Sequence, residues 1–583
     1  MVANRGEIAL RVMRSCREMG IVSVAVFSEA DRASRHVFYA DEAYCIGGAA
    51  SQESYLNGDR ILEVARGCGA DAIHPGYGFL SENASFARKC GEAGIIFIGP
   101  AAETIELMGD KISARRTMIE AGVPVVPGTQ QNLVSADEAV EVCRRIGFPV
   151  MLKASQGGGG KGMRLVRREA DVREAFEAAR SEAMASFGDD TVYIERFVKE
   201  PHHIEFQVLG DRFGHVIHLC ERECSVQRRH QKIIEESPSP LMTAELRERM
   251  GRDAVAAARA VGYLGAGTVE FLVDRERNYY FLEMNTRLQV EHPITEEVCG
   301  VDLVKEQIFV ADGRPLRLTQ RDIVQRGHAI ECRICAEDAS AGFMPSPGVI
   351  SQLTEPGGIG VRLDSYVYEK YEIPVHYDPM IGKLIVWATT REFAVERMRR
   401  ALDEYKITGV KTNIAYLGSI LELPELVGGD YNTSVLEKNA DRLALQQERG
   451  DREEIENMAM ITALINYMVS LEEGGAGSPA GAALSGFTRG GGHRHAEPLA
   501  RIRQTQRRQG HLKASVMEIE IGNRKAEVEW LGKNGNDVQV SIDGRTIGAN
   551  VVLTDNGICS ILYQGRSYNM EAVSFEGGRR YKG

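Results

Sequence analysis

The segment 283–291, with the sequence EMNTRLQVE, concentrates the side chains of this chain that are best suited to chemistry. In an extended strand, successive side chains point to opposite faces. The polar face of such a strand would carry Glu283, Asn285, Arg287, Gln289 and Glu291. Burying this polar row costs free energy unless ligands or partners satisfy it. The row therefore predicts a site for a metal ion and an anion, and the alternative is a solvated strand face that binds nothing.

A second carboxylate faces this row in a predicted hairpin. Two strand-like runs flank a polar turn, and a hairpin centred on that turn pairs Val273 with Tyr280 and Glu270 with Glu283. Opposed residues have Cβ atoms ~5 Å apart, and two carboxylates at that distance repel by a few kcal/mol at an effective dielectric of roughly 20. Either one of them is protonated or a divalent cation lies between them. An oxygen-liganded cation such as Mg²⁺ fits, with Asn285 and substrate phosphates completing its shell.

The bulk properties place these residues in a large multidomain protein. A chain of 583 residues is too long for one core and predicts about three to five domains. The net charge of −12 argues against general nucleic-acid binding, which needs a basic surface. The eleven scattered cysteines indicate free thiols. No signal peptide and no run long enough to span a bilayer is visible, so we expect a cytoplasmic protein that does not bind membranes.

The elements that must position the site follow a clear order. Up to about residue 110, short apolar runs alternate with amphipathic helices, which predicts a doubly wound α/β domain with a parallel sheet. Its predicted strands are 22–27, 43–46, 72–74 and 95–98. Residues 124–198 are expected to form a small separate unit, and 199 to about 445 a larger α+β body that contains the polar row.

A glycine-rich loop lies within the small unit. Residues 155–162 join two predicted strands, 150–154 and 163–166. The loop lacks the Ser or Thr that follows the lysine in a P-loop, and a strand follows it instead of a helix. It therefore predicts a hairpin whose backbone amides fold over phosphates, with Lys111 and Lys153 as cations for the phosphate oxygens.

The chain changes character after residue 445. We expect an amphipathic helix over 451–471, a Gly/Ala/Ser-rich linker over 474–492 and a flexible basic stretch over 501–508. From residue 515 onward the pattern is strands and tight turns. Two segments, 542–547 and 563–568, predict two copies of one hairpin.

Several motifs occur in a fixed order along the first 445 residues. They are ANRGEIA at 3–9, HPGYGFLSEN at 74–83, MGDK at 108–111, KAS at 153–155, HIEFQV at 203–208, ECSVQRRHQK at 223–232, EMNTRLQVEHP at 283–293 and ECR at 331–333. Taken together, this order resembles the biotin carboxylases of the ATP-grasp superfamily. The fold that this resemblance implies is α/β and α+β multidomain.

The same resemblance implies a division into domains. They are a biotin carboxylase N-terminal (pre-ATP-grasp) domain at 1–109, an ATP-grasp domain at 110–318 with a lid at about 124–198, a biotin carboxylase C-terminal domain at 328–440, a helix and flexible linker at 446–514, and at 515–583 a β-rich domain like the segment before a biotinyl domain.

The resemblance also implies roles for individual residues. ATP phosphates or ribose would be bound by Lys111, Lys153, Gly159, Gly160, His203 and His230. The backbone of Glu195 and Val198 would hold adenine. Mg²⁺ or Mn²⁺ would be bound by Glu270, Glu283 and Asn285. Bicarbonate would be held by Lys232, Arg287, Gln289 and the Val290 amide. Glu291 would be the base that deprotonates bicarbonate, and Arg333 would stabilise the biotin enolate.

These roles imply ATP-dependent carboxylation of biotin by bicarbonate, the first half-reaction of an acetyl- or propionyl-CoA carboxylase. No Ala-Met-Lys-Met biotinylation motif occurs, so biotin is expected on a carrier that is a separate protein or lies beyond this sequence. The expected partners are that carrier, carboxyltransferase subunits and a second copy of the chain. The alternatives are the biotin carboxylase part of a pyruvate carboxylase, another ATP-grasp carboxylate–amine ligase, or an inactive scaffold protein.

Overall fold

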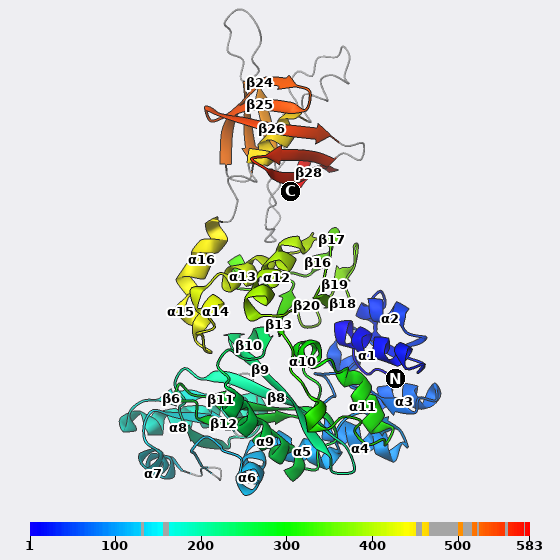
Figure 1. Cartoon of the computed structure of the whole chain (residues 1–583), viewed down its shortest axis with the longest axis vertical. Coiled ribbons are helices and arrows are strands. Elements are labelled where there is room, and N and C mark those ends of the chain that lie inside the picture. The colour runs from blue at the N-terminus through cyan, green and yellow to red at the C-terminus, as the bar shows by residue number, and fades with distance from the viewer. Residues whose placement is uncertain are drawn as a thin grey trace, which may run out of the picture. The chain divides into compact units, whose positions relative to one another are not determined.

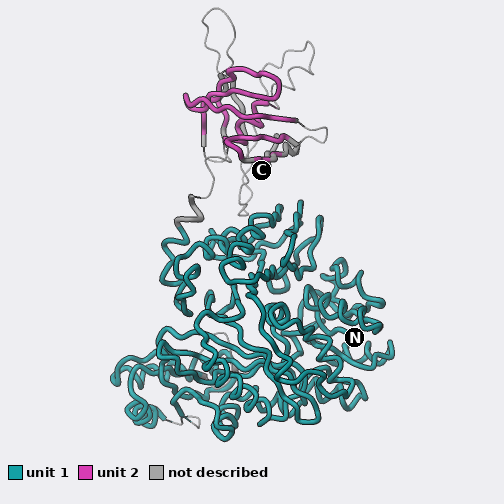
Figure 2. Tube along the Cα trace, viewed as in Figure 1, with its two compact units in different colours: residues 1–447 teal, residues 448–583 magenta. Residues whose placement is uncertain are grey.

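The protein is described here by a computed structural model of the whole chain. It describes residues 1–129, 133, 135–154, 163–449, 457–465, 500–504, 516–521, 524–553, 558–575 and 578–582. The chain divides into two compact units, residues 1–447 and 448–583 (Figure 2). Within the described ranges, no helix combines the length and apolar character needed to cross a membrane.

Unit 1 begins with the parallel α/β domain that the sequence predicts (Figure 1). Strand β1 pairs in parallel with β2, and β3 with β4. Val2 bridges Ala25 and His74 and so joins the two pairs. The elements are α1 (Gly6–Glu18), β1 (Val24–Ser28), α2 (Arg35–Tyr39), β2 (Glu42–Gly47), α3 (Gly58–Gly67), β3 (Ala72–Ile73), α4 (Ala84–Glu92) and β4 (Ile96–Phe97). Helix α1 forms because its apolar residues recur at helical spacing and bury one face.

A small antiparallel sheet follows, in the order β6-β5-β7. Its elements, with the two helices that precede it, are α5 (Ala102–Gly109), α6 (Lys111–Glu120), α7 (Ala136–Ile146), β5 (Val150–Ala154), β6 (Arg164–Val166), α8 (Val172–Phe187) and β7 (Val192–Arg196). Helix α7 begins where the Ser135 side chain accepts a hydrogen bond from the Glu138 amide. The helices α7 and α8 and the strands share a core of their own. The predicted glycine-rich loop 155–162 lies outside the described residues.

An eight-stranded sheet forms the centre of unit 1, in the order β12-β11-β8-β9-β10-β13-β20-β18. Its strands are β8 (His202–Gly210), β9 (Val216–Arg228), β10 (Gln231–Ser237), β11 (Gly265–Val273), β12 (Tyr279–Asn285), β13 (His328–Cys335), β18 (Val361–Ser365) and β20 (Met380–Ala388). The neighbouring helices are α9 (Ala244–Ala260), α10 (His292–Cys299) and α11 (Leu303–Ala311). Because β10 pairs with β13, this one sheet contains strands from both the predicted ATP-grasp domain, 110–318, and the predicted C-terminal domain, 328–440.

The remaining elements of unit 1 lie around β13 and β20. Short strand pairs join β14 (Glu337–Asp338) to β15 (Met344–Pro345), β16 (Gly348–Val349) to β19 (Glu372–Ile373) and β17 (Gln352–Thr354) to β21 (Lys406–Thr408). The helices are α12 (Arg391–Glu404), α13 (Ile414–Leu421), α14 (Pro424–Gly428), α15 (Val435–Lys438) and α16 (Ala440–Arg449). Helices α12 and α13 pack with the C-terminal strands into one hydrophobic core.

The predicted hairpin is the pair β11–β12, and its register is partly as expected. Glu270 pairs with Glu283, which confirms the predicted opposition of the two carboxylates. The predicted Val273–Tyr280 pair is wrong, because Val273 pairs with Tyr279. A bulge next to Glu270 shifts the register by one residue. The prediction assumed one continuous register along the whole hairpin, so it did not include the extra residue that the bulge adds to β12.

Unit 2 is an antiparallel sheet in the chain order β22 to β29, and its first and last strands contact each other. Its strands are β22 (Ala500–Gln504), β23 (Val516–Ile521), β24 (Arg524–Asn534), β25 (Asp537–Ile542), β26 (Arg545–Leu553), β27 (Ile558–Tyr563), β28 (Arg566–Phe575) and β29 (Gly578–Lys582). Residues 457–465 form a helix whose buried side chains join the core of this curled sheet. The rest of the predicted helix and the linker 474–492 lie outside the described residues.

The two predicted hairpin copies are present in unit 2. Asp543 and Gly544, and likewise Gln564 and Gly565, have positive φ at both central turn positions. This is the geometry of a two-residue type I′ turn, whose twist matches that of the flanking strands. The expectation of a flexible basic stretch was wrong for residues 501–504, which form part of β22, because pairing with β23 satisfies their backbone.

Candidate functional site

Lys232, on β10, lies at the centre of the predicted site. Its ammonium nitrogen Nζ donates to Oε2 of Glu205 at 2.6 Å, to Oε1 of Glu270 at 2.9 Å and to Oε1 of Glu291 at 2.7 Å. The Lys232 side chain is 12% exposed and the three carboxylates are almost fully buried. Three acids from β8, β11 and the start of α10 are therefore held around one cation that solvent still reaches.

The charges of this cluster are set by the balance between burial and ion pairing. Burial disfavours the charged form of Lys232, yet the three carboxylates raise its pKa well above the ordinary value. Burial likewise opposes ionisation of Glu291, but Lys232 and Arg333 hold the pKa of that carboxyl well below its usual range. Glu291 is consequently a carboxylate at neutral pH, as a proton acceptor must be.

Arg333, on β13, fixes the other oxygen of Glu291. Its Nη2 donates to Oε2 of Glu291 at 3.0 Å, and its Nε donates to Oε1 of Glu235 at 2.7 Å. Glu291 precedes the first residue of α10, and its side chain makes no cap hydrogen bond. Its orientation is therefore controlled by Lys232 and Arg333.

The predicted polar row converges, but not as one continuous strand. Strand β12 ends at Asn285, and residues 286–291 form bends and a turn. Asn285 and Gln289 nevertheless both donate side-chain amide hydrogens to Oε1 of Glu270 at 2.9 Å. Arg287 donates from Nη2 to Oδ1 of Asn285 at 3.1 Å and from Nε to Oε2 of Glu82 at 2.8 Å. The predicted strand alternation does not continue past Asn285, because Glu82 accepts a hydrogen bond from the Thr286 amide and stabilises the non-strand conformation of the backbone there.

Glu270 and Glu283 fit a divalent cation. Burial and the charge of Glu270 raise the pKa of Glu283. Burial acts the same way on Glu270, but Lys232 and His203 hold its pKa well below the usual range. One carboxylate is thus ionised, while the other is disfavoured as an anion until a positive charge arrives. His203 donates from Nε2 to Oε2 of Glu270 at 2.7 Å, since Gln227 donates to its Nδ1.

Two further sets of ligand atoms lie within 4.8 Å of one another in the described part of the chain. They are His203, Glu205 and Glu270, and Glu205, Cys224 and Glu291. Both sets include carboxylates that already contact the Lys232 ammonium. A metal ion there would compete with that cation, so the opposed pair Glu270 and Glu283 is the better candidate.

The predicted phosphate-binding lysines lie beside this carboxylate pair. Lys111 starts α6, and burial lowers its pKa, with Glu283 opposing that shift and Lys153 adding to it. Lys153 donates from Nζ to Oε2 of Glu195 at 2.7 Å. Glu195 also accepts from Arg115 at 2.9 Å. Two ammonium groups near the candidate metal ligands form an electrostatic environment suited to a polyphosphate.

The remaining predicted residues are less closely joined to this cluster. Val198 follows β7 and is half-buried. His230 lies in the exposed turn between β9 and β10 with a φ of +64°. The carbonyl of Val290 accepts from Nζ of Lys383 at 2.8 Å. Gly159 and Gly160 lie outside the described residues.

Sequence reasoning missed several residues of the site, among them Glu205, Glu82 and Arg222. Glu205 could have been found, since His203 and Gln207 flank it at the two-residue spacing of one strand face. Glu82 and Arg222 gave no such signal, because their contacts in the site come from distant segments of the chain.

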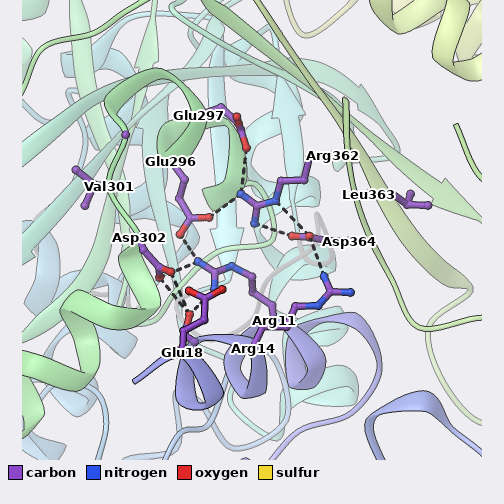
Figure 3. Close-up of a pocket in the computed structure, with 12 residues that line it drawn as sticks. Arg11, Arg14, Glu18, Glu296, Glu297, Val301, Asp302, Arg362, Leu363 and Asp364 are labelled. Atoms are coloured by element: carbon purple, nitrogen blue, oxygen red, sulfur yellow. Dashed lines mark hydrogen bonds and ion pairs between the residues drawn. The ribbon is translucent and has the colours of Figure 1, made fainter. Parts of the chain in front are cut away.

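A separate polar pocket of about 390 Å³ lies at the other end of α10 (Figure 3). Arg11 donates from Nη2 to Glu296 at 2.6 Å and to Asp302 at 2.9 Å. Arg362 donates to Glu296 at 2.9 Å and to Asp364 at 2.8 Å. Figure 3 shows the two arginines side by side among these acids. None of the predicted site residues lines this pocket.

Three family profiles match most of unit 1. They are "Biotin carboxylase, N-terminal domain" at residues 1–105, "Carbamoyl-phosphate synthase L chain, ATP binding domain" at 110–319 and "Biotin carboxylase C-terminal domain" at 331–438. Curated proteins match the same region. A pyruvate carboxylase subunit of Methanothermobacter thermautotrophicus is 58% identical over 438 residues, 75% of this chain and 89% of that protein. The biotin carboxylase of Nostoc sp. is 56% identical over 438 residues, 75% of this chain and 98% of that protein.

Solved structures agree with this assignment. One is the biotin carboxylase domain dimer of the Hydrogenobacter thermophilus 2-oxoglutarate carboxylase, in complex with MgADP, ADP and bicarbonate. It has a TM-score of 0.73 and is 51% identical to this chain, and the match covers 76% of this chain and 97% of that one. The Campylobacter jejuni biotin carboxylase–β-γ-ATP complex has a TM-score of 0.73 and 50% identity over 75% and 98%. The chain therefore belongs to the biotin carboxylase family of ATP-grasp ligases, which carboxylate biotin with ATP and bicarbonate.

Proposed function

We propose that this chain is the biotin carboxylase component of an acyl-CoA carboxylase, acting on acetyl- or propionyl-CoA with a biotin carrier and carboxyltransferase subunits. The catalytic region does not distinguish the acceptors, because relatives named for pyruvate carboxylase and for biotin carboxylase are similarly identical to it. Unit 2 does not separate the acceptors either, because the match takes up 89% of the Methanothermobacter subunit and 98% of the Nostoc biotin carboxylase, which leaves neither with room for a counterpart of unit 2. The choice of an acyl-CoA acceptor is therefore tested by the partner chains.

For the nucleotide, we propose the following ligands. ATP phosphates or ribose would be bound by Lys111, Lys153, Gly159, Gly160, His203 and His230, and adenine by the backbone of Glu195 and Val198. A divalent cation would be held by Glu270, Glu283 and Asn285, and when bound it would neutralise the phosphate oxygens. The two lysines add positive charge on the same side, so this arrangement supports phosphoryl transfer through positioning and charge neutralisation.

For the first step, we propose that bicarbonate is held by Lys232, Arg287, Gln289 and the Val290 amide. Glu291 takes the bicarbonate proton, and the resulting oxyanion attacks the γ-phosphorus of ATP. The new P–O bond gives carboxyphosphate, and ADP leaves with the electrons of the broken P–O bond. Support comes from Glu291, which is buried, ionised and 2.7 Å from the Lys232 ammonium.

For the second step, we propose that carboxyphosphate breaks down to CO₂ and phosphate beside biotin. Phosphate accepts the proton of the ureido nitrogen, and that nitrogen forms a bond to CO₂. Arg333 would stabilise the enolate form of the ureido group. Its guanidinium is held between Glu235 and Glu291 and remains partly exposed, so it is placed next to the proposed base.

The observation that carries this proposal is the Lys232–Glu291–Arg333 arrangement. Purified enzyme with free biotin should release ADP only when bicarbonate is present. Arg287→Ala should abolish this turnover and spare ATP binding, whereas full turnover in that variant would contradict the assigned site. Capture of the partner chains, followed by assays with acetyl-CoA, propionyl-CoA and pyruvate, tests the acceptor. Carboxylation of pyruvate alone would favour the pyruvate carboxylase alternative.

We also propose that the enzyme is a homodimer. The Hydrogenobacter thermophilus biotin carboxylase domain, which is 51% identical to this chain, is a dimer. Light scattering of the purified chain measures the assembly directly, and a monomer at assay concentration would contradict this proposal.

A further inference from the structure

Arg222, on β9, is a fully buried cation beside the proposed bicarbonate site. Its side chain has no exposed area. It donates hydrogen bonds to five side chains, which come from β8, β11, α10 and the turn before α10. They are Glu205 Oε1 at 2.5 Å, Gln207 Oε1 at 2.7 Å, Thr295 Oγ1 at 2.9 Å, Thr268 Oγ1 at 3.0 Å and Gln289 Oε1 at 3.4 Å. A guanidinium with this many partners is held in one orientation.

The first consequence concerns the Gln289 amide. Arginine can only donate hydrogen bonds, so the Gln289 atom that faces Arg222 must be the carbonyl oxygen. The amide NH₂ group then points the other way, where it donates to Oε1 of Glu270 at 2.9 Å. If the amide rotated by 180°, two donors would face each other at Arg222. Arg222 on one side, at 3.4 Å, and the Glu270 carboxylate on the other, at 2.9 Å, therefore hold the Gln289 amide with its NH₂ group toward the side where an anion is proposed to bind.

The second consequence concerns Lys232. Oε1 of Glu205 accepts from Arg222, and its Oε2 accepts from Lys232 at 2.6 Å. Arg222 thus fixes the carboxylate that anchors the Lys232 ammonium. Arg222 itself does not reach the solvent-accessible side of the cluster, since its side chain is completely enclosed.

We propose that Arg222 is a positioning residue for bicarbonate, which it serves without contact by orienting the Gln289 amide and anchoring Lys232 through Glu205. This inference rests on the proposed function, in which Gln289 and Lys232 hold bicarbonate. A charged residue of purely structural importance would affect folding and both substrates alike. A positioning residue for bicarbonate should affect the KM for bicarbonate more than the KM for ATP.

The test measures bicarbonate-dependent ADP release with free biotin. Arg222→Lys keeps a positive charge but loses the planar fork, and we expect at least about a tenfold higher KM for bicarbonate, with the KM for ATP within about twofold. Arg391→Lys is the matched control, because Arg391 also forms a two-pronged contact, with Glu236 on β10, outside the site. It should leave both KM values unchanged.

A double-mutant cycle then isolates the pathway through Gln289. In a Gln289→Ala background, Arg222→Lys should raise the KM for bicarbonate by clearly less than it does in the wild type. If Arg222→Lys does not fold, Thr295→Val removes one acceptor of Arg222 and should give a smaller rise in the same KM.

The outcomes separate this inference from the proposed function. A folded Arg222→Lys enzyme with both KM values unchanged, or changed equally, would overturn the role of Arg222 alone. Full additivity with Gln289→Ala would overturn the part of that role that acts through Gln289. A Gln289→Ala enzyme with an unchanged KM for bicarbonate would overturn the proposed function of Gln289 and this inference with it.

Discussion

Nζ of Lys232 lies 2.7 Å from Oε1 of Glu291. The residue that we propose as the base is thus paired with a residue that we propose to bind its substrate. This pairing lowers the basicity of Glu291 as long as no anion is bound. If bicarbonate accepts hydrogen bonds from Lys232 as proposed, Glu291 would share that cation and become a stronger base. The proposed roles would then couple substrate binding to proton removal.

Glu291→Gln should abolish turnover and keep ATP binding. The amide is similar in shape but cannot accept the bicarbonate proton, and loss of a general base typically costs about 10²–10⁴-fold in rate. The measurement is bicarbonate-dependent ADP release, with ATP affinity followed by calorimetry. Glu248→Gln, an exposed position on α9, is the control and should behave as wild type. Turnover of Glu291→Gln within about tenfold of wild type would remove Glu291 from the role of base.

Glu283→Gln should weaken Mg²⁺ binding. Glu283 lies opposite Glu270, and burial together with that neighbouring charge raises its pKa. A divalent cation would relieve this repulsion, so we expect the Mg²⁺ concentration for half-maximal rate to rise by at least about tenfold. The increase in Tm that Mg²⁺ adds to the ADP complex should also shrink.

The control for this prediction is Glu276→Gln, in the exposed turn of the same hairpin. It should keep the wild-type dependence on Mg²⁺. An unchanged Mg²⁺ requirement in Glu283→Gln would place the cation elsewhere.

Glu235→Gln should change how stability depends on pH. Burial raises the pKa of Glu235 to about 7, against the opposing effect of Arg333. The folded state therefore binds more protons than the unfolded state between about pH 4.5 and 7. The stability from this group is fully present below about pH 4.5 and is lost as the pH rises through 7.

The variant should accordingly lose less stability than the wild type on going from pH 5 to pH 8. The difference is at most about 3 kcal/mol, since one pKa unit corresponds to about 1.4 kcal/mol. Urea unfolding across this range measures it, and Glu248→Gln should keep the wild-type slope. Parallel stability curves for Glu235→Gln and wild type would contradict the prediction.

Local patterns predicted the parts of the site that depend on neighbouring strands. The opposition of Glu270 and Glu283 follows from one hairpin, because a turn fixes the register of the strands next to it. The parallel strands of the N-terminal domain were predicted from short apolar runs within one or two residues. The two hairpins of unit 2 were predicted because segments 542–547 and 563–568 resemble each other, and the structure gives both turns positive φ.

Contacts between distant segments were not predictable in the same way. Glu82 lies 204 residues before Thr286 in the chain, yet it accepts the Thr286 amide and bends the row away from a strand. Arg222 is one of many arginines in the sequence, and only the folded sheet shows that its partners come from several strands. Strand β22 was missed because its arginines indicated solvent exposure, while its pairing with β23 is a long-range backbone property.

Turnover with free biotin should not require a folded unit 2. Helix 457–465 buries Met458, Met460, Ile461 and Leu464 within its curled sheet. Leu464→Asp would place an unpaired carboxylate in that core, which costs at least about 3 kcal/mol. Unit 2 should unfold, whereas free-biotin turnover should stay within about twofold, because the Nostoc biotin carboxylase matches this chain over 98% of its own length without a counterpart of unit 2.

Fluorescence can follow the two units separately, since the chain has only two tryptophans. Trp387 lies on β20 of unit 1, and Trp530 packs against the core of unit 2. In a Trp387→Phe background, Leu464→Asp should shift the Trp530 emission to longer wavelength, and Leu464→Met should leave it unchanged. If free-biotin turnover fell together with the Trp530 signal, the two units would unfold as one, and catalysis would depend on both.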